Sequence, residues 1–509
     1  MKKFINKIQK TKLNSAIADT TSNQRGVILF TRSKLKFVAL LVGIFLIGYT
    51  QIFAQTFNGG NGSQIAPWRI SNIANIMELN DWVSGIAPAT GGVPFDFAGQ
   101  FFVLTNDIGT PIPVTTVIGG NAANNIINIA AGAFAGNFNG NGFTITLLLN
   151  SFNANLGMGV ALFNAVTKNG IIRNLNVNGR VKGGFAAGIA SSLLDNATID
   201  NCVNNCYIEC GTALAAGGIV SNVVSGSPRI LNSKNSGRIV GFAESHAGGI
   251  VGIIRNKSNN TLISNNTNIG NVTGGFSGGI CSHSDAPSVF CSNLNGGVVE
   301  GSATVGGIIG AAISGNILTN CISTTPIINY NYIPPGAVIG TTYDYFGMPN
   351  LTITNCFYDS LMFTGNGIGA IQTPWITITT VPNVLGSIEG LTTFDMIFNA
   401  LASRLPTGVW IFEQELYPRL DNHPVSYLAA SPIHLSVNSA TGMFDNVNDI
   451  TQNFYIPHRN GVSWRSEYLI VDINPMTGIA TISVGSNDSD TLIAILGIFE
   501  KKLYPLFVP

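Results

Sequence analysis

Carboxylates are the first residues in this sequence that could do chemistry, because paired acids hydrolyse glycosidic bonds. Glycosidase carboxyl pairs lie about 5 to 9.5 Å apart. The repeat alignment described below puts Glu209 and Glu300 in one column, three coils or about 14 Å apart. It also places Lys182 beside Glu209 and Arg173 beside Asp200, as surface ion pairs. We therefore expect no catalytic pair among the six acids between residues 146 and 320: Asp195, Asp200, Glu209, Glu244, Asp285 and Glu300.

Cysteines with regular spacing are the next candidates. Cys202, Cys206 and Cys210 follow a C-x3-C-x3-C pattern. Zinc motifs usually add a second ligand pair elsewhere, and no histidine or fourth cysteine falls in register here. In the alignment, the three cysteines replace small residues: Ser233, Gly237 and Gly241. We expect small buried side chains stacked along the fold, with a disulfide to a neighbouring coil as the alternative.

Histidines and a calcium-like run complete the candidates. His246 stands three residues before Gly249, whereas His283 stands four after Gly279, and the other three histidines lie beyond residue 420. The sequence therefore predicts no histidine triad and no metal centre. Asn487-Asp488-Ser489-Asp490 could hold calcium, but a hairpin turn is the commoner meaning of such a run. No catalytic, metal or cofactor site is expected, and the ligand-binding residues cannot be assigned.

Composition limits the class of protein that could carry these residues. The 509 residues are 45% hydrophobic and only 10% charged, with 59 glycines and equal numbers, 25 each, of basic and acidic side chains. Disordered chains, coiled coils and basic nucleic-acid binders do not have this composition. Nine of the basic residues lie in residues 1–54 with one acid, so residues 55–509 carry a net charge of about −8. That charge disfavours nucleic acid and anionic membranes as partners.

The basic N-terminal segment is followed by thirteen uncharged residues, 37–49. A long basic region before a short apolar run is the layout of a signal peptide. We expect residues 1–54 to be a signal peptide cleaved after Ala54, which leaves Gln55 as the mature start. An uncleaved N-terminal anchor is the alternative. Either interpretation predicts an exported protein, extracellular or at the cell surface.

A repeat of about 30 residues fills the middle of the chain. A glycine followed by an apolar pair recurs at Gly188, Gly218, Gly249, Gly279 and Gly307, with spacings of 30, 31, 30 and 28. A second pattern, apolar-x-Asn-x-x-x-x-Gly-x-apolar-x-Gly, occurs at 171–183, 230–241 and 263–274. The segments are short and β-branched with glycine or asparagine at the breaks, so they indicate strands. One coil cannot bury its own apolar stripe, and successive coils must therefore stack.

Aligning the copies gives columns with a physical character. Two columns are apolar and are expected to face the core: Ile172, Ile199, Ile230, Ile263, Phe290 and Leu318; and Val181, Ile208, Ile239, Val272, Val299 and Ile327. A third column contains asparagines whose amides are expected to pair inside the turns: Asn174, Asn201, Asn232, Asn265 and Asn320, with Ser292 between the last two. Such amide ladders satisfy buried polar groups.

These columns predict an all-β protein built around a parallel, right-handed β-helix. Helices at Ser71–Val83, with a possible N-cap serine, and at Thr392–Ala402 are expected to cap its two ends. The tail has strand-like runs around Asn474-Pro475-Met476-Thr477-Gly478, which suggests a small Ig-like β-sandwich. The expected domains are an N-terminal cap with the first coils at 55–145, repeats at 146–360, a C-terminal cap at 361–424 and the sandwich at 425–509.

In some copies the apolar pair is followed by a second glycine, which gives a tetrad of glycine, two apolar residues and glycine. This tetrad, followed by the asparagine pattern, resembles the GLUG-motif family of bacterial surface and secreted proteins. Gly249 to Gly252 and Gly307 to Gly310 match the tetrad, whereas its last glycine is Ser221 or Ser282 in two other copies. The resemblance covers roughly residues 160–360. It implies a noncatalytic, surface-displayed, adhesin-like repeat and supplies no catalytic residue.

The sequence as a whole predicts an exported protein that acts in adhesion or ligand binding, is not an enzyme and needs no cofactor. Its partner would be a glycan or a protein at a surface, with no nucleic acid, and with membrane contact only through an uncleaved N-terminus. The alternatives are a carbohydrate-active β-helix enzyme, either a polysaccharide lyase or a hydrolase, and a purely structural envelope or stalk protein.

Overall fold

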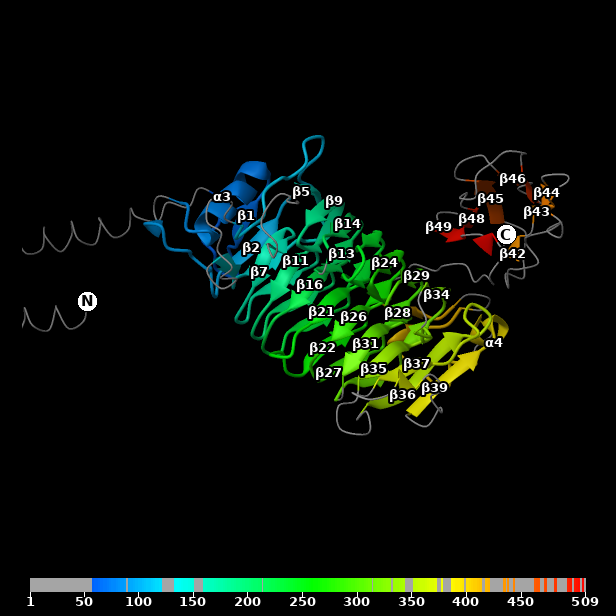
Figure 1. Cartoon of the computed structure of the whole chain (residues 1–509). Helices are drawn as coiled ribbons and strands as arrows, with labels where there is room; N and C mark the ends of the chain where they lie inside the picture. Colours follow the sequence, from blue (N-terminus) through cyan, green and yellow to red (C-terminus); the bar gives the residue numbers. More distant parts are fainter. Residues whose placement is uncertain are drawn as a thin grey trace, which may run out of the picture. The chain divides into compact units, whose positions relative to one another are not determined.

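The chain forms a β-solenoid whose coils stack in sequence order (Figure 1). The computed structural model describes residues 57–421, except for gaps at 88–89, 121–131, 151–158, 213, 314, 331–332, 344–350, 373–376, 379–385, 398–399 and 414–416, and short strands between 434 and 507. Apart from Thr377–Ile378, which pairs antiparallel with the strand before it, the solenoid strands pair in parallel with their counterparts in the next coil. The β-solenoid expected from the repeat is therefore confirmed, whereas its handedness stays a prediction.

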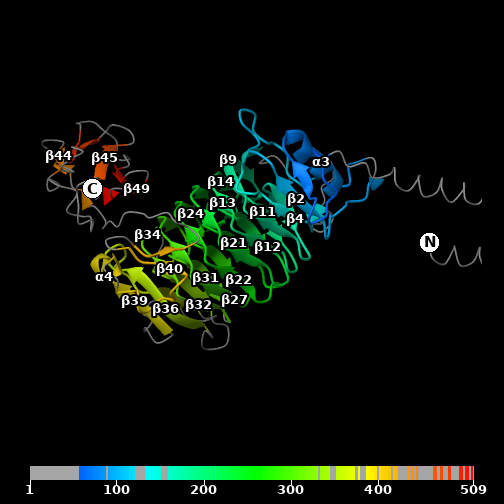
Figure 2. The ribbon, with the colours of Figure 1, turned by 180° about the vertical axis from the view of Figure 1, so that it is seen from behind.

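Three sheets run along the solenoid. Sheet A has 23 strands, in two segments of each coil. Its first segment is β1 (Trp68–Ile70), β2 (Phe101–Leu104), β4 (Asn137–Asn139), β8 (Ile171–Arg173), β12 (Thr198–Asp200), β17 (Arg229–Leu231), β22 (Thr261–Ser264), β27 (Ser288–Cys291), β32 (Ile317–Thr319), β36 (Thr352–Asp359) and β39 (Gly386–Leu391). Figure 2 shows β12, β22, β27 and β32 of this segment from the opposite side. The second segment is β5 (Thr144–Asn150), β9 (Asn176–Gly183), β13 (Val203–Asn204), β14 (Tyr207–Cys210), β18 (Lys234–Asn235), β19 (Ile239–Val240), β23 (Thr267–Asn268), β24 (Val272–Gly274), β28 (Leu294–Asn295), β29 (Val299–Gly301), β33 (Ile322–Ser323) and β34 (Ile327–Asn329).

Sheets C and B complete each coil. The six strands of sheet C are β6 (Gly159–Val160), β10 (Phe185–Ala187), β15 (Ala215–Gly217), β20 (His246–Gly248), β25 (Phe276–Gly278) and β30 (Val305–Gly306). The ten of sheet B are β3 (Ala133–Phe134), β7 (Phe163–Val166), β11 (Ala190–Leu193), β16 (Val220–Val223), β21 (Val251–Ile254), β26 (Cys281–Ser284), β31 (Ile309–Ile313), β35 (Ile339–Tyr343), β37 (Ile368–Gln372) and β38 (Thr377–Ile378).

The two apolar columns lie in register and face the core, as the sequence predicts. Ile199 pairs with Ile172 on one side and Ile230 on the other, and the column continues to Leu318. The second column runs in the same way from Val181 to Ile327. All twelve side chains are buried. Each contributes about 1.5 to 3 kcal/mol by leaving water, which makes these stripes a main source of stability.

The predicted asparagine column was assigned to the wrong environment. Asn232 and Asn265 do pair, with Asn265 Nδ2 donating to Asn232 Oδ1 at 3.3 Å, but both side chains are only partly buried. Their backbones, like those of the whole column, have φ near +50°. Asparagine tolerates this left-handed conformation better than most residues. The column therefore marks the turn between the two segments of sheet A, not the solenoid interior.

The interior amide ladder consists of a different asparagine, three residues further along each coil. Asn204, Asn235, Asn268 and Asn295 are fully buried. Their amides bond in series, with Nδ2 to Oδ1 distances of 2.7, 2.8 and 2.9 Å. Each also bonds the backbone two residues ahead, as Asn235 does with the N–H and C=O of Gly237. Every polar atom of these side chains is thereby satisfied inside an apolar core.

This ladder explains why the repeat begins with glycine. A β-carbon on Gly218 would lie 2.6 Å from Cγ of Asn235, and one on Gly249 would lie 2.4 Å from Cγ of Asn268. Gly279 stands in the same relation to Asn295, at 2.3 Å. Real side chains do not tolerate such approaches in a close-packed interior. The repeat glycine and the buried asparagine of each of these coils are therefore in direct contact.

A helix caps the first coils, but with a different N-cap from the expected one. Helix α3 (Ile73–Val83) is capped by Asn72, whose Oδ1 accepts from the Asn75 N–H at 3.0 Å, and not by Ser71. Ile76 and Leu79 are buried in the core, as the helical spacing predicts, whereas Met77 is 50% exposed. Since asparagine caps a helix as well as serine does, both positions satisfied the sequence rule.

The C-terminal cap covers the side of the last coils. Helix α4 has only five residues, Thr393–Ile397. Met396, Leu401 and Tyr417 pack with Leu294, Ile322 and Phe357, which project outward from sheet A. The buried Asp359 carboxylate accepts hydrogen bonds from the hydroxyls of Thr393 and Tyr417. Thr393, Met396, Leu401 and Tyr417 are thus fixed to the outer face of sheet A. The expected helical side chains Phe394, Ile397 and Phe398 lie outside the described residues.

Short strands follow in the tail: β40 (Trp410–Ile411), β41 (Arg419–Leu420), β42 (His434–Leu435), β43 (Val437–Asn438), β44 (Met443–Phe444), β45 (Val462–Ser466), β46 (Val471–Ile473), β47 (Ala480–Ile482), β48 (Leu492–Leu496), β49 (Phe499–Leu503) and β50 (Leu506–Phe507). The runs on both sides of residues 474–478 form the antiparallel pair β46–β47. The Ig-like assignment remains a prediction.

Residues 1–54 and 487–490 lie outside the described residues, so the signal peptide and calcium interpretations do too. None of the helices among the described residues has the length and hydrophobicity to cross a membrane.

Candidate functional site

Each coil bends sharply between sheet C and sheet B, and the bend brings outward side chains of the two sheets together. Gly249-Ile250 joins β20 to β21, and Gly279-Ile280 joins β25 to β26. β20 also lies against β26 of the following coil. Side chains at this bend are buried without belonging to the main core, among them Ala215, Ile253 and Ala311. We call this surface, where the outward residues of β10, β15, β20 and β25 meet those of β16, β21, β26, β31 and β35, the corner.

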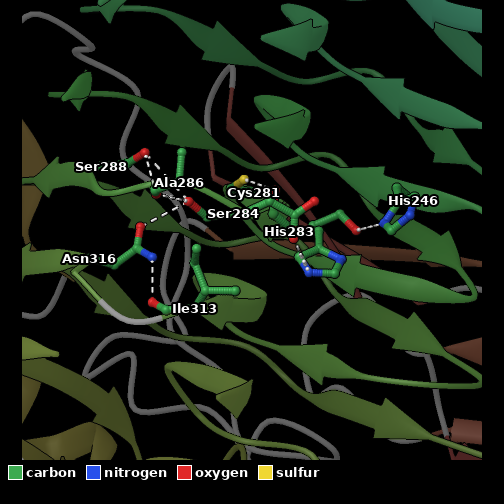
Figure 3. Close-up of polar contacts among 10 residues, drawn as sticks. His246, Cys281, His283, Ser284, Ala286, Ser288, Ile313 and Asn316 are labelled. Atoms are coloured by element: carbon green, nitrogen blue, oxygen red, sulfur yellow. Dashed lines mark hydrogen bonds and ion pairs between the residues drawn. The ribbon is translucent and has the colours of Figure 1, made fainter. Parts of the chain in front are cut away.

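Two histidines meet in the corner, which corrects the expectation that the histidines do not cluster. The rings of His246 and His283 lie 5.2 Å apart and approach from different strands, β20 and β26 (Figure 3). The bend explains the error, because a residue three before the glycine of one coil faces a residue four after the glycine of the next. Counting from the glycine along the chain hides this proximity. Comparing the residues before the glycine of one coil with the residues after the glycine of the next coil would have revealed it.

The histidines extend into a strip of rings. His246 stacks on Phe276 with centroids 4.8 Å apart and planes at 21°. His283 stacks on Tyr343 at 5.9 Å and 15°. All four rings are partly exposed. Such stacking is favourable beyond the burial of apolar area, and it holds each ring in one orientation.

Two charged groups are fixed beside the rings. His283 Nε2 lies 2.9 Å from Oδ1 of Asp285, whose side chain is 33% exposed. Burial acts to raise the pKa of Asp285, but the hydrogen bond from His283 and nearby positive charge more than offset it, so that the pKa is lowered. Arg255 Nε donates to Asn222 Oδ1 at 3.3 Å, and its guanidinium lies 5.8 Å from the ring of Phe185. The corner thus presents one carboxylate and one guanidinium in fixed positions.

The serine in the corner is not placed to act as a nucleophile. Ser282 Oγ lies 3.4 Å from His246 Nδ1, a long contact, and donates to the Phe276 carbonyl at 2.8 Å. Ser221, at the equivalent position two coils earlier, makes the same bond to Ala215 at 2.7 Å. Both serines are fully buried. The hydroxyl therefore fills the last position of the tetrad and satisfies a backbone carbonyl at the bend.

The environment of His246 leads to a prediction about acid stability. Burial lowers the pKa of His246 from 6.5 to about 3, and the positive charges of His283 and Arg255 act in the same direction. Below pH 6.5, His246 therefore binds a proton in the unfolded chain but stays unprotonated in the native state. The free energy of unfolding then falls by about 1.4 kcal/mol per pH unit until the pH reaches the pKa of His246 in the native state. We expect the parent to lose about 2 kcal/mol between pH 6.5 and 5 from this residue alone, measured by urea unfolding.

The control for this prediction is His246→Phe, because phenylalanine occupies the corresponding position of sheet C in two other coils, at Phe185 and Phe276. Its unfolding free energy should vary less with pH by the same amount. Equal pH slopes for the parent and the variant would show that His246 is accessible to protons in the native state.

The acids singled out from the sequence lie where the alignment puts them. Glu209 pairs with Lys182, and Glu300 follows three strands later through Val240 and Thr273. Glu209 Oε2 lies 2.5 Å from Lys182 Nζ and accepts from the Tyr207 hydroxyl at 2.9 Å. Burial acts to raise the pKa of Glu209, and these bonds outweigh burial and lower it. A salt-bridged carboxylate about 14 Å from its nearest candidate partner has no geometry for glycoside hydrolysis.

The other expected ion pair is in register but bonds differently. Asp200 pairs with Arg173 along the sheet. The Asp200 carboxylate accepts a hydrogen bond from Asn232 Nδ2 at 2.7 Å. This contact belongs to the turn column described above and has no catalytic character.

The cysteines are free thiols. Cys202, Cys206 and Cys210 are fully buried, and burial raises the pKa of Cys202 and Cys210 to about 12. Since metals bind the thiolate, thiols held in the protonated form do not favour a metal site. Among the residues described, no three histidine, cysteine or acidic side chains are grouped to hold a metal ion. The expectation of small buried side chains stacked along the solenoid is confirmed for these three.

Comparisons with known proteins add a resemblance in structure. No protein-family model and no curated protein sequence matches the chain. Among solved structures, the chain is similar to one from Bacteroides ovatus described as a "putative immunoglobulin A1 protease", at 17% identity and a TM-score of 0.43. The match covers 72% of this chain and 96% of that one. At this identity and TM-score, the similarity carries no inference about activity.

Proposed function

We propose that the chain is an exported, surface-displayed and noncatalytic protein of the GLUG-like kind, which binds a ligand at the cell surface or acts in adhesion. The observation that carries the proposal is the corner, where partly exposed rings and two fixed charged groups are gathered on an otherwise regular solenoid. Ligand sites typically combine aromatic surface with a few well-placed polar groups. The basic and apolar residues before Gln55 support the export part of the proposal.

The bonding of the potential catalytic groups supports binding over catalysis. Ser282 donates to a backbone carbonyl, and Glu209 is bonded to Lys182 and Tyr207. A hydrolase or lyase needs a nucleophile, acid or base within reach of the reacting atoms. The carbohydrate-active enzyme therefore remains the rival that an experiment must address.

The test is to offer the exported chain to arrays of glycans and surface proteins and to analyse the offered material for cleavage. We expect retention of at least one ligand with no released product. Product release would replace the proposal with the enzyme. If the chain binds nothing on any array and also fails to adhere to cells, the envelope or stalk role would replace the proposal.

A further inference from the structure

We infer that the corner is a binding subsite for a neutral pyranose sugar, an inference that rests on the proposed function. Two near-parallel ring pairs, His246 with Phe276 and His283 with Tyr343, are joined by the contact between the two histidines (Figure 3 shows His246 and His283). One face of a pyranose consists of C–H groups and is apolar, whereas its rim carries hydroxyls. Fixed aromatic rings match such a face, because they bury apolar area with little loss of side-chain freedom.

The residues between the rings have short side chains. Ala311 pairs with His283 on one side and with Thr341 on the other, so a short side chain separates the strands that carry His283 and Tyr343. Both Ala311 and Thr341 are fully buried. The four rings therefore come from β20, β25, β26 and β35, and a ligand lying along the corner can contact rings from different coils.

The polar groups of the corner suit hydroxyls. Asp285 is held by His283 and remains one-third exposed, and Arg255 is held by Asn222. Groups that are already oriented lose little entropy when they bond a ligand. The Asp285 carboxylate and the Arg255 guanidinium carry opposite charges, so these two fixed groups do not together select an ionic ligand of one sign.

Two other classes of ligand fit less well. Polyanions would be repelled by the net negative charge of residues 55–509. An extended peptide usually adds to a free strand edge. The strands of the corner have none, because β20 pairs with β15 and β25, β26 with β21 and β31, and β35 with β31 and β37. The neutral sugar is the class that these observations favour.

The experiment is calorimetric titration of the full exported chain with neutral hexasaccharides of glucose, mannose, galactose and N-acetylglucosamine, and with a sulfated counterpart. We expect at least one neutral sugar to bind. Tyr343→Ala and Phe276→Ala should each weaken that binding about 5- to 10-fold, whereas Tyr343→Phe keeps the ring and should stay within about 2-fold. Tyr330→Ala is the matched control, because Tyr330 is 71% exposed and follows β34 in sheet A, outside the corner.

The outcomes separate this inference from the proposed function. Unchanged binding in Tyr343→Ala and Phe276→Ala, with melting temperatures like that of the parent, would place the sugar elsewhere and overturn the inference. Binding of the sulfated sugar alone would overturn it as well. If the parent binds none of the neutral sugars yet still adheres to cells through a protease-sensitive partner, the sugar assignment fails and the proposed function survives.

Discussion

Replacing Asn235 with leucine is expected to cost the native state about 3 to 5 kcal/mol. The side chain is fully buried and bonds Asn204, Asn268 and both backbone groups of Gly237. Leucine would leave the N–H and C=O of Gly237 without these partners and would break the ladder in both directions. Each buried polar group left unpaired costs about 1 to 3 kcal/mol. Urea or thermal unfolding of the full chain measures the loss.

Asn232→Leu is the matched control, three residues earlier in the same coil. Its cost should be about 1 to 2 kcal/mol, because leucine is disfavoured at φ +49° and because two partly buried side-chain hydrogen bonds, with Asp200 and Asn265, are lost. The order of the two variants is the decisive result. If Asn232→Leu were the more damaging, the interior ladder would be formed by the turn column after all.

Gly249→Ala should be nearly as damaging, at about 3 kcal/mol. The added β-carbon would lie 2.1 Å from the Gly279 carbonyl oxygen and 2.4 Å from Cγ of Asn268. The first contact is with backbone of the next coil, which cannot move without breaking the parallel pairing. The expected result is a melting temperature several degrees below that of the parent and below that of any variant with an alanine on open surface.

Gly142→Ala provides that comparison. Gly142 has φ +81°, and a β-carbon there would meet nothing within 4 Å, so only the backbone conformation is penalised, by about 1 kcal/mol. Equal losses in Gly142→Ala and Gly249→Ala would mean that the tetrad glycine is needed for its backbone freedom and not for the contact with the ladder.

The stacking of coils could be predicted because a repeat converts sequence spacing into spatial register. Ile199 and Ile230 are neighbours in space simply because they occupy the same position in successive coils. The direction of a side chain is harder to predict. Asn232 and Asn235 both recur in the repeat, and the left-handed turn at Asn232 decides which amide faces inward. Nothing in the residue type separates the two.

The corner shows the second limit of the sequence. His246 and His283 come from different coils and from opposite sides of a bend, so comparing equivalent positions of successive coils does not connect them. The angle between sheets C and B depends on the Gly-Ile bend, and the alignment alone does not give that angle. The candidate acids, by contrast, were placed correctly, because Glu209 and Glu300 share one straight column.

The claim that this solenoid binds a ligand without turning it over is tested most directly by measuring binding and product release together, on one ligand, at 50 and 500 mM salt. Salt mainly screens exposed charges, and a neutral ligand offers none, so the affinity should change by less than about 2-fold. The ligand should be recovered intact, and Glu209→Gln and Glu300→Gln should behave like the parent. Cleavage by the parent that disappears in either variant, with unfolding unchanged, would contradict the account and identify an enzyme.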